Sequence, residues 1–289
     1  MWFRRSRPGI NARAGGEDPD LCYRPLPGGP ERLMSTFDES KHPETGDPYF
    51  LSTKTIPPED RLIFALDVPT VEEAKRLVET LSDAVQFYKV GLELLGTGGY
   101  FELIEWLVER EKKVFADLKL FDVPETVRSA MRRLREWPIT LTTVHGGSAA
   151  ILEAACQEKG TLQILAVTVL TSLSQEDLWE MGLQTEVYQL VLARARQAVE
   201  LGCDGVIASG LEAHGLRRSL GQGPLIVTPG IRPAENRPAD DQKRVVTVEQ
   251  ALRNGADYIV VGRPIRNAAD PYEAAMQIQG TIEGLFLSG

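Results

Sequence analysis

The sequence predicts an α/β protein whose chain folds into a (β/α)8 TIM barrel. Eight short apolar segments alternate with amphipathic segments from residue 61 onward, which is the rhythm of strands followed by helices. The apolar segments carry few polar residues, as expected of parallel strands that are covered on both faces. No G-x-G-x-x-G motif follows the first segment, which disfavours an open dinucleotide-binding sheet. A closed barrel of about 225 residues is therefore expected.

The expected strands and helices follow in order along the chain. The strands are expected over residues 62–68, 87–92, 114–120, 140–144, 162–170, 205–208, 225–228 and 258–261. Helices are expected over residues 100–109, 124–136, 149–158 and 188–201, with a short one near 176 and others starting near 70, 212, 247 and 270. Thr70 and Thr247 begin capping-box patterns, and Asp270 followed by Pro271 is typical of a helix start.

The composition narrows the class of protein and its compartment. A net charge of −9 and a pI near 5.1 argue against a nucleic-acid partner, which would need a basic patch. No apolar run of about 18 residues is present, so no membrane-spanning helix is expected. The cysteines show neither metal nor redox spacing, and three histidines are too few for a multi-histidine metal site. We therefore expect a cytoplasmic globular protein.

Residues 1–57 differ from the rest of the chain. They are rich in glycine, proline and arginine at first and show no hydrophobic periodicity. Two interpretations stay open: a disordered extension, or a mis-assigned start, with Met34 as the true first residue. The barrel domain is expected to cover residues 58–289.

The segment around residues 114–126 carries the most informative motif, D-x-K-x-x-D, made by Asp117, Lys119 and Asp122. Side chains of a strand alternate between its faces, so Asp117 and Lys119 are expected to point the same way. Burying both charges on an apolar strand is costly unless they pair. Taken alone, the motif is most simply a surface ion pair.

Polar residues recur where the other expected strands end. The active site of such barrels lies at the carboxyl ends of the strands, so these residues are expected to converge on one mouth. They are Asp67, Lys89, Asp117, Lys119, His145, Thr168, Thr171, Ser172, Arg232, Gly262 and Arg263. This convergence makes the surface ion pair the minor interpretation.

The last two strands predict a phosphate site. Barrels often bind phosphate with the loops after strands seven and eight, through backbone N–H groups and a cation. Gly262 permits close approach of the backbone, and Arg263 offers a bidentate guanidinium. The loop over residues 232–244 is too long for a plain connector, which favours an active-site lid.

The chain from residue 62 onward resembles the orotidine 5′-phosphate decarboxylase family. The resemblance rests on six motifs in the family's order. They are Ala65-Leu-Asp67, Tyr88-Lys89-Val-Gly91, Asp117-Leu-Lys119-Leu-Phe-Asp122-Val-Pro-Glu-Thr126, Ala166-Val-Thr-Val-Leu-Thr171-Ser172, Val227-Thr-Pro-Gly-Ile-Arg232-Pro and Val261-Gly262-Arg263-Pro264. The resemblance implies a carboxy-lyase of de novo pyrimidine biosynthesis that converts orotidine 5′-phosphate (OMP) to UMP and CO2, without cofactor or metal.

The resemblance also implies a role for each site residue. Lys89, Asp117, Lys119 and Asp122 would form the catalytic charge network, with Lys119 as the proton donor to C6 of the pyrimidine. A homodimer with shared active sites is implied, in which Asp122 and Thr126 serve the neighbouring subunit. The substrate-binding residues would be Asp67 and Lys89 at the ribose, Thr171 after strand five, and Arg232, Gln242, Gly262 and Arg263 around the phosphate.

Small departures from the family pattern occur beside the network. Phe121 stands where many relatives carry histidine, and Glu125 where many carry asparagine. Neither change removes a charge. His145 is expected to be a packed, hydrogen-bonded histidine without a catalytic role.

Two alternatives stay open. One is a magnesium-dependent sugar-phosphate decarboxylase or hexulose-phosphate synthase of the same superfamily, which shares the D-x-K-x-x-D strand. The segments 170–172 and 230–233 favour the orotidylate branch. The other is a non-catalytic nucleotide-binding barrel, which would have no reason to retain a costly buried charge cluster.

Overall fold

The computed structural model describes residues 50–232 and 244–287, and it forms a closed barrel of eight parallel strands. Each strand pairs with its neighbour in the chain, and β1 closes the ring by pairing with β8. The strands are β1 Leu62–Ala65, β2 Phe87–Gly91, β3 Lys113–Leu120, β4 Leu141–His145, β5 Gln163–Val167, β6 Gly205–Ile207, β7 Leu225–Thr228 and β8 Tyr258–Val261. The predicted (β/α)8 barrel is thereby confirmed.

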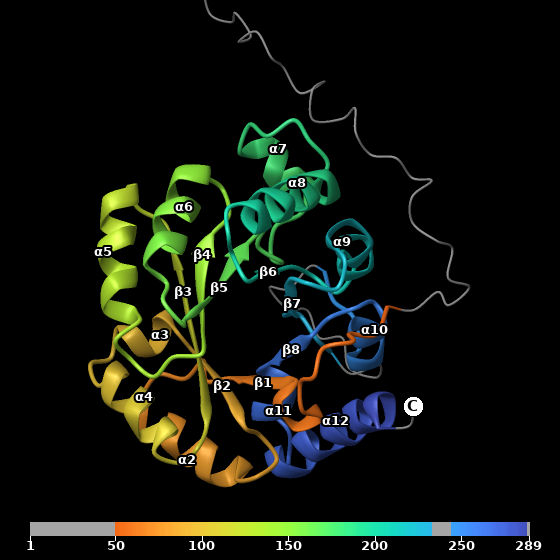
Figure 1. The fold of residues 1–289 in the computed structure, drawn as a ribbon. Helices are drawn as coiled ribbons and strands as arrows, with labels where there is room; N and C mark the ends of the chain where they lie inside the picture. Colours follow the sequence, from red (N-terminus) through yellow and green to blue (C-terminus); the bar gives the residue numbers. More distant parts are fainter. Residues whose placement is uncertain (1–49, 233–243, 288–289) are drawn as a thin grey trace, which may run out of the picture. The chain divides into compact units, whose positions relative to one another are not determined.

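Helices cover the outside of the ring of strands (Figure 1). They are α2 Val71–Leu81, α3 Leu92–Leu95, α4 Tyr100–Val108, α5 Pro124–Leu134, α6 Ala149–Glu158, α7 Gln175–Glu180, α8 Val187–Glu200, α9 Ala213–Leu220, α10 Val248–Arg253, α11 Arg263–Arg266 and α12 Pro271–Phe286, after the 3-10 turn η3 Pro58–Asp60. The short helices α3 and α11 were not predicted, because four residues are too few to show a helical period.

The predicted helix starts at Thr70, Thr247 and Asp270 are confirmed by their hydrogen bonds. The side chain of each accepts from the backbone N–H three residues later. Thr247 makes the full reciprocal box with Gln250, and Pro271 occupies the first turn after Asp270. These local bonds satisfy backbone donors that a helix start leaves free.

Two layers of core follow from the alternation of side chains along the strands. Ile63, Phe115 and Leu141 belong to the cluster inside the barrel. Leu62 and Phe64 belong to the larger cluster between strands and helices. Strands β1 and β5 end earlier than predicted, at Ala65 and Val167, because the chain leaves the ladder there to form the mouth of the barrel.

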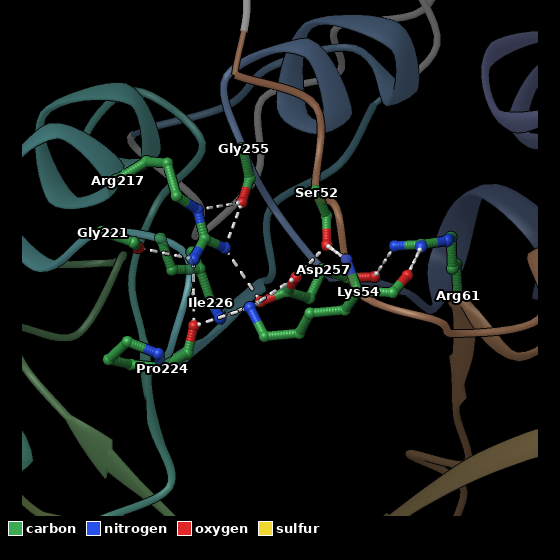
Figure 2. A network of polar contacts seen from close by, with 9 residues as sticks. All are labelled: Ser52, Lys54, Arg61, Arg217, Gly221, Pro224, Ile226, Gly255 and Asp257. Carbon is green, nitrogen blue, oxygen red and sulfur yellow. Dashed lines mark hydrogen bonds and ion pairs between the residues drawn. The ribbon is translucent and has the colours of Figure 1, made fainter. Parts of the chain in front are cut away.

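A charge cluster closes the amino end of the barrel, and we call Ser52, Lys54, Arg61, Arg217 and Asp257 the base cluster (Figure 2). Asp257 directly precedes β8 and is fully buried. Its carboxylate accepts hydrogen bonds from Ser52 Oγ, from Lys54 Nζ at 3.1 Å and from Arg217 Nη2 at 2.9 Å. Arg61 donates to the backbone oxygen of Asp257 at 3.1 Å.

The base cluster joins the chain before the barrel to the barrel itself. Ser52 and Lys54 lie within the predicted extension 1–57, yet both bond to Asp257. The boundary at residue 57 therefore leaves out residues that contact the barrel. Residues 1–49, including Met34, lie outside the described part of the chain.

Candidate active site

A cavity of about 690 Å³ opens at the carboxyl ends of the strands. Its lining includes eight of the eleven residues to which the resemblance assigns a role. These are Asp67, Lys89, Asp117, Lys119, Thr171, Arg232, Gly262 and Arg263. Its floor is apolar, with Phe115, Val167, Ile207 and Val260 among its residues. Of the eleven polar residues expected at the strand ends, these eight and Ser172 line the cavity, whereas His145 and Thr168 do not.

Four of these side chains form a row of alternating charge across β3, β2 and the end of β1. Lys119 Nζ lies 2.7 Å from Asp117 Oδ2, and Lys89 Nζ lies 3.5 Å from the same oxygen. Lys89 Nζ also donates to Asp67 Oδ1 at 2.8 Å. Each buried charge therefore has an opposite charge beside it, which offsets the cost of removing it from water.

The row also sets the protonation of its inner members. Burial alone would lower the pKa of Lys89, but the carboxylates of Asp117 and Asp67 outweigh it and hold that pKa above its ordinary value. Burial alone would raise the pKa of Asp117, but Lys89 and Lys119 outweigh it and hold that pKa below its ordinary value. Both groups therefore stay charged near neutral pH.

Lys119 lies in an irregular part of β3. Ala116 pairs with Thr142 and Leu120 with Val144, so four steps along β3 match only two along β4. This bulge gives Lys119 a φ of 47°, in the left-handed region that residues with a Cβ rarely adopt. The alternation rule predicted that Lys119 meets Asp117, and they do meet, but through a bulge rather than a regular strand.

Arginines also line the cavity. Arg232 follows β7, while Arg263 and Arg266 belong to α11 after β8. In a ring of eight strands β7 lies opposite β3, so Arg232 faces the Lys119 end of the charge row across the mouth, whereas β8 pairs with β1, so α11 lies beside the Asp67 end. The cavity therefore combines cations suited to an anion such as phosphate with a row of paired lysines and aspartates.

Two predicted residues are not among the described residues that line the cavity. Asp122 and Thr126 are exposed on the turn after β3 and in the first turn of α5. The Oδ1 atom of Asp122 accepts a hydrogen bond from Val123 N at 2.6 Å. Gln242 lies outside the described residues.

Comparisons with known proteins identify the family. A family model described as "Orotidine 5′-phosphate decarboxylase / HUMPS family" matches residues 60–278. The chain belongs to this family. An orotidine 5′-phosphate decarboxylase of Methylococcus capsulatus is 61% identical over 242 residues, which are 84% of this chain and all of the relative. One from Xanthomonas oryzae pv. oryzae is 53% identical over 224 residues, 77% of this chain and 92% of the relative.

Solved structures of the family share the barrel. The crystal structure of orotidine 5′-phosphate decarboxylase from Lactobacillus acidophilus matches with a TM-score of 0.68 and 36% identity, over 77% of this chain and 99% of that chain. The enzyme from Pyrococcus horikoshii matches with a TM-score of 0.62 and 29% identity, over 77% and 99%. The family name covers two groups, whereas these relatives carry the decarboxylase name.

Three site residues escaped the sequence analysis. Arg266 lines the cavity and donates to the backbone oxygen of Asp67. It lies three residues after Arg263, and this spacing indicates a shared helix face only once the short helix α11 is known. Arg244 pairs with the buried Glu212 and donates to the backbone oxygen of Leu170 at 3.0 Å. The third is Thr143 of β4, which bonds to Lys119 and Asp117. All three act through partners far along the chain, which a motif search does not detect.

His145, expected to be packed and hydrogen-bonded, lies at the end of β4. Its ring packs against Phe121, with 4.9 Å between ring centroids, and its Nδ1 accepts from Gly147 N at 3.3 Å. Burial, followed by the nearby Arg194, lowers the pKa of His145.

The described residues contain neither a metal-binding cluster nor a membrane-spanning helix. Within residues 50–232 and 244–287, no cluster of three or more His, Cys, Asp or Glu side chains has the arrangement of a metal site. In that part of the chain, every helix is too short or too polar to cross a membrane.

Proposed function

We propose that this protein decarboxylates OMP to UMP and CO2, and that Lys119 delivers the proton to C6 of the pyrimidine. The observation that carries the proposal is the row Lys119–Asp117–Lys89–Asp67, which borders a cavity that arginines also line. The family membership reported above supports the same reaction.

The chemistry explains why such a row is needed. Loss of CO2 from C6 leaves a vinyl carbanion, and no adjacent π-system can absorb its charge. A site can stabilise that charge only by fixed positive groups nearby, which act strongly because they need no reorganisation. The ammonium of Lys119 supplies such a charge. Its proton then passes to C6, forming the C–H bond of UMP, and water returns a proton to Lys119.

Other groups would bind the substrate around this centre. Asp117 would face the substrate carboxylate and disfavour the bound ground state, in addition to holding Lys119. Asp67 and Lys89 would bind the ribose hydroxyls, and Thr171 would contact the substrate from the loop after β5. The phosphate would meet its ligands at the arginine-lined end, namely Arg232, Gln242, Gly262 and Arg263. Binding of this remote group would help to close the site around the reacting carbon.

The first experiment follows the loss of the orotate chromophore when purified protein is mixed with OMP and a metal chelator. We expect rapid turnover, and Lys119→Ala should lower kcat by at least about 10³-fold, since charge stabilisation and proton donation are both lost. Lys113→Ala is the matched control, because Lys113 begins the same strand and pairs with Asp60 away from the cavity.

The outcomes separate the alternatives. Turnover of OMP that the chelator leaves unchanged would exclude the magnesium-dependent branch of the superfamily. No turnover of OMP under any condition would fit either alternative, namely that branch, which acts on sugar phosphates, or a non-catalytic nucleotide-binding barrel. Lys119→Ala with wild-type kcat would remove Lys119 from the mechanism while leaving the reaction in place.

We also propose a homodimer in which Asp122 and Thr126 complete the partner's site. Both are exposed in the single chain, and Phe121 and Val123 beside them are each 63% exposed. Large apolar side chains exposed together are typical of an interface. Leu92, which follows the neighbouring strand β2, is also an exposed large apolar side chain, at 59%.

The dimer is tested by mixing two inactive variants. Lys119→Ala and Asp122→Ala, unfolded and refolded together in equal amounts, should recover about one quarter of the wild-type activity. Half of the dimers are then mixed, and each mixed dimer carries one intact site of two. Activity no higher than that of the separate variants, in a sample shown to contain mixed dimers, would contradict shared sites.

A cytoplasmic location is part of this proposal. Cys156 and Cys203 are the cysteines in the described part of the chain, and both are free thiols, as is usual in a reducing compartment. Recovery of the activity outside the cell or with membranes after fractionation would contradict it.

A further inference from the structure

The hydroxyl of Thr143 lies between the backbone and the side chains of the charge row. Thr143 is on β4 and is fully buried. Its Oγ1 accepts from the backbone N–H of Lys119 at 2.8 Å and donates to Asp117 Oδ1 at 2.9 Å. A backbone N–H can only donate and an ionised carboxylate can only accept, so the direction of both bonds is fixed.

These bonds close a ring through Lys119. Its backbone N–H donates to Thr143, Thr143 donates to one oxygen of Asp117, and the other oxygen of Asp117 accepts from Lys119 Nζ at 2.7 Å. Lys119 is thus held at both ends, at a φ of 47° that costs free energy by itself. Such a conformation persists only where its surroundings fix it.

The bulge in β3 explains why a side chain is needed for this role. The ladder between β3 and β4 is interrupted between Ala116 and Leu120, and Lys119 lies in the interruption. A buried N–H without a partner costs free energy, and the Thr143 hydroxyl supplies the partner for Lys119 N–H. Thr143 itself is not among the residues that line the cavity.

We propose that Thr143 is a positioning residue of the decarboxylase site, which fixes the Asp117 carboxylate and the bulged backbone of Lys119 relative to the substrate. This inference rests on the proposed function. The inference goes beyond the proposed function by naming a buried hydroxyl, outside the cavity lining, on which the placement of the proton donor depends.

The same hydroxyl stabilises the ionised form of Asp117. In the described part of the chain, the charged and ionisable groups near that carboxylate are Lys119 on β3, Lys89 on β2, the phenol of Tyr100 on α4, and Asp67 after β1, which shares Lys89 with Asp117. β4 contributes the neutral hydroxyl of Thr143. Its loss removes a hydrogen bond to the charged form, so the pKa of Asp117 rises in its absence.

The experiment compares Thr143→Val, Thr143→Ser and Thr142→Val with the wild type. Valine keeps the shape of threonine but removes the hydroxyl, and serine keeps the hydroxyl. Thr142 is the matched control, because it is equally buried on the same strand and donates to Ala116 O at 2.9 Å on the outer face of the barrel.

We expect Thr143→Val to lower kcat for OMP by about 10- to 100-fold, as misplacement of a catalytic group typically does, with KM changed by less than about 3-fold. The acidic limb of its kcat–pH profile should move to higher pH. Thr143→Ser should restore most of kcat, and Thr142→Val should keep wild-type kcat and pH profile.

A carboxyl titration of Asp117 by ¹³C NMR gives a readout that needs no substrate. Its pKa should rise in Thr143→Val and stay unchanged in Thr142→Val. Wild-type kcat or an unshifted Asp117 in a folded Thr143→Val protein would overturn the inference. An equal loss of kcat in Thr142→Val, or no recovery in Thr143→Ser, would also overturn it. A wild-type protein that does not turn over OMP, with the Asp117 shift as expected, would instead overturn the proposed function alone.

Discussion

Two clusters of buried charge lie at opposite ends of the same barrel, and they are built differently. In the base cluster, cations bond to backbone oxygens as well as to Asp257: Arg217 donates to Gly255 O and Pro224 O, and Lys54 also donates to Pro224 O. In the charge row at the mouth, Lys89 and Lys119 bond to carboxylates, and their side chains line the cavity.

The two clusters therefore have different roles. In the base cluster each cation bonds to oxygens of the protein itself and the carboxylate is completely enclosed, so the cluster stabilises one arrangement of the chain. The charge row leaves Lys119 about one-third exposed toward the cavity and holds it on a strained backbone. Strain and exposed charge cost stability, and such features concentrate where a site must act on a ligand.

The largest expected contrast comes from neutralising one aspartate in each cluster. Asp257→Asn should lower the free energy of unfolding by about 3–5 kcal/mol, because two buried cations lose their counter-charge, while kcat stays unchanged. Asp117→Asn should lower kcat by at least about 10²-fold, with a much smaller loss of stability because Lys89 keeps Asp67. Chemical denaturation and steady-state kinetics on both variants measure the contrast. Equal losses of stability would contradict this division of roles.

A smaller contrast concerns the pH dependence of stability through two lysines. Burial lowers the pKa of Lys54 from its ordinary 10.5, with Asp257 opposing and Arg217 adding to the effect. The unfolded chain therefore keeps the Lys54 proton to higher pH than the folded chain does. As a result, Lys54 makes the free energy of unfolding rise with pH between its lowered pKa in the folded chain and 10.5. The pKa of Lys89 is raised instead, so its contribution falls only above 10.5.

Denaturation of the wild type and of Lys54→Met at a series of alkaline pH values checks the sign. The variant should lack the part of the rise in free energy of unfolding that Lys54 contributes as pH approaches 10.5 from below. Lys89→Met is the companion, and it should keep that rise. Parallel curves for Lys54→Met and the wild type would show that the base cluster does not disfavour the charged lysine.

The smallest expected effect tests whether the segment before the barrel belongs to it. Ser52→Ala removes one hydrogen bond to the buried Asp257 and should cost about 1 kcal/mol of stability. Thr80→Ala is the control, because it removes an exposed hydroxyl and should cost less. Ser174→Ala would not serve, because Ser174 caps a helix. A cost for Ser52→Ala no larger than that for Thr80→Ala would indicate that Ser52 contributes little to the barrel.

The site was predictable to the extent that its residues belong to short motifs. Asp117 and Lys119 are two residues apart, and Arg263 follows a glycine at a strand end, so local spacing was enough to single them out. Arg266 and Thr143 were missed because their roles depend on contacts between different strands and helices. No local pattern distinguishes Thr143 from Thr142, although only the former bonds to the charge row.

The barrel could be predicted from the sequence alone, because eight apolar segments that alternate with helices have few other ways to bury their surfaces. The sequence also determined that polar groups meet at one mouth, because parallel strands end together. Three features are visible only in the tertiary structure. A bulge in β3 holds Lys119 at a positive φ, and the Thr143 hydroxyl of β4 bonds to the Lys119 backbone. Asp257 bonds to Ser52 and Lys54, which precede the barrel. Each of these depends on the register between strands or on side chains remote in sequence, where the free energy of a contact is set by geometry and burial rather than by local spacing.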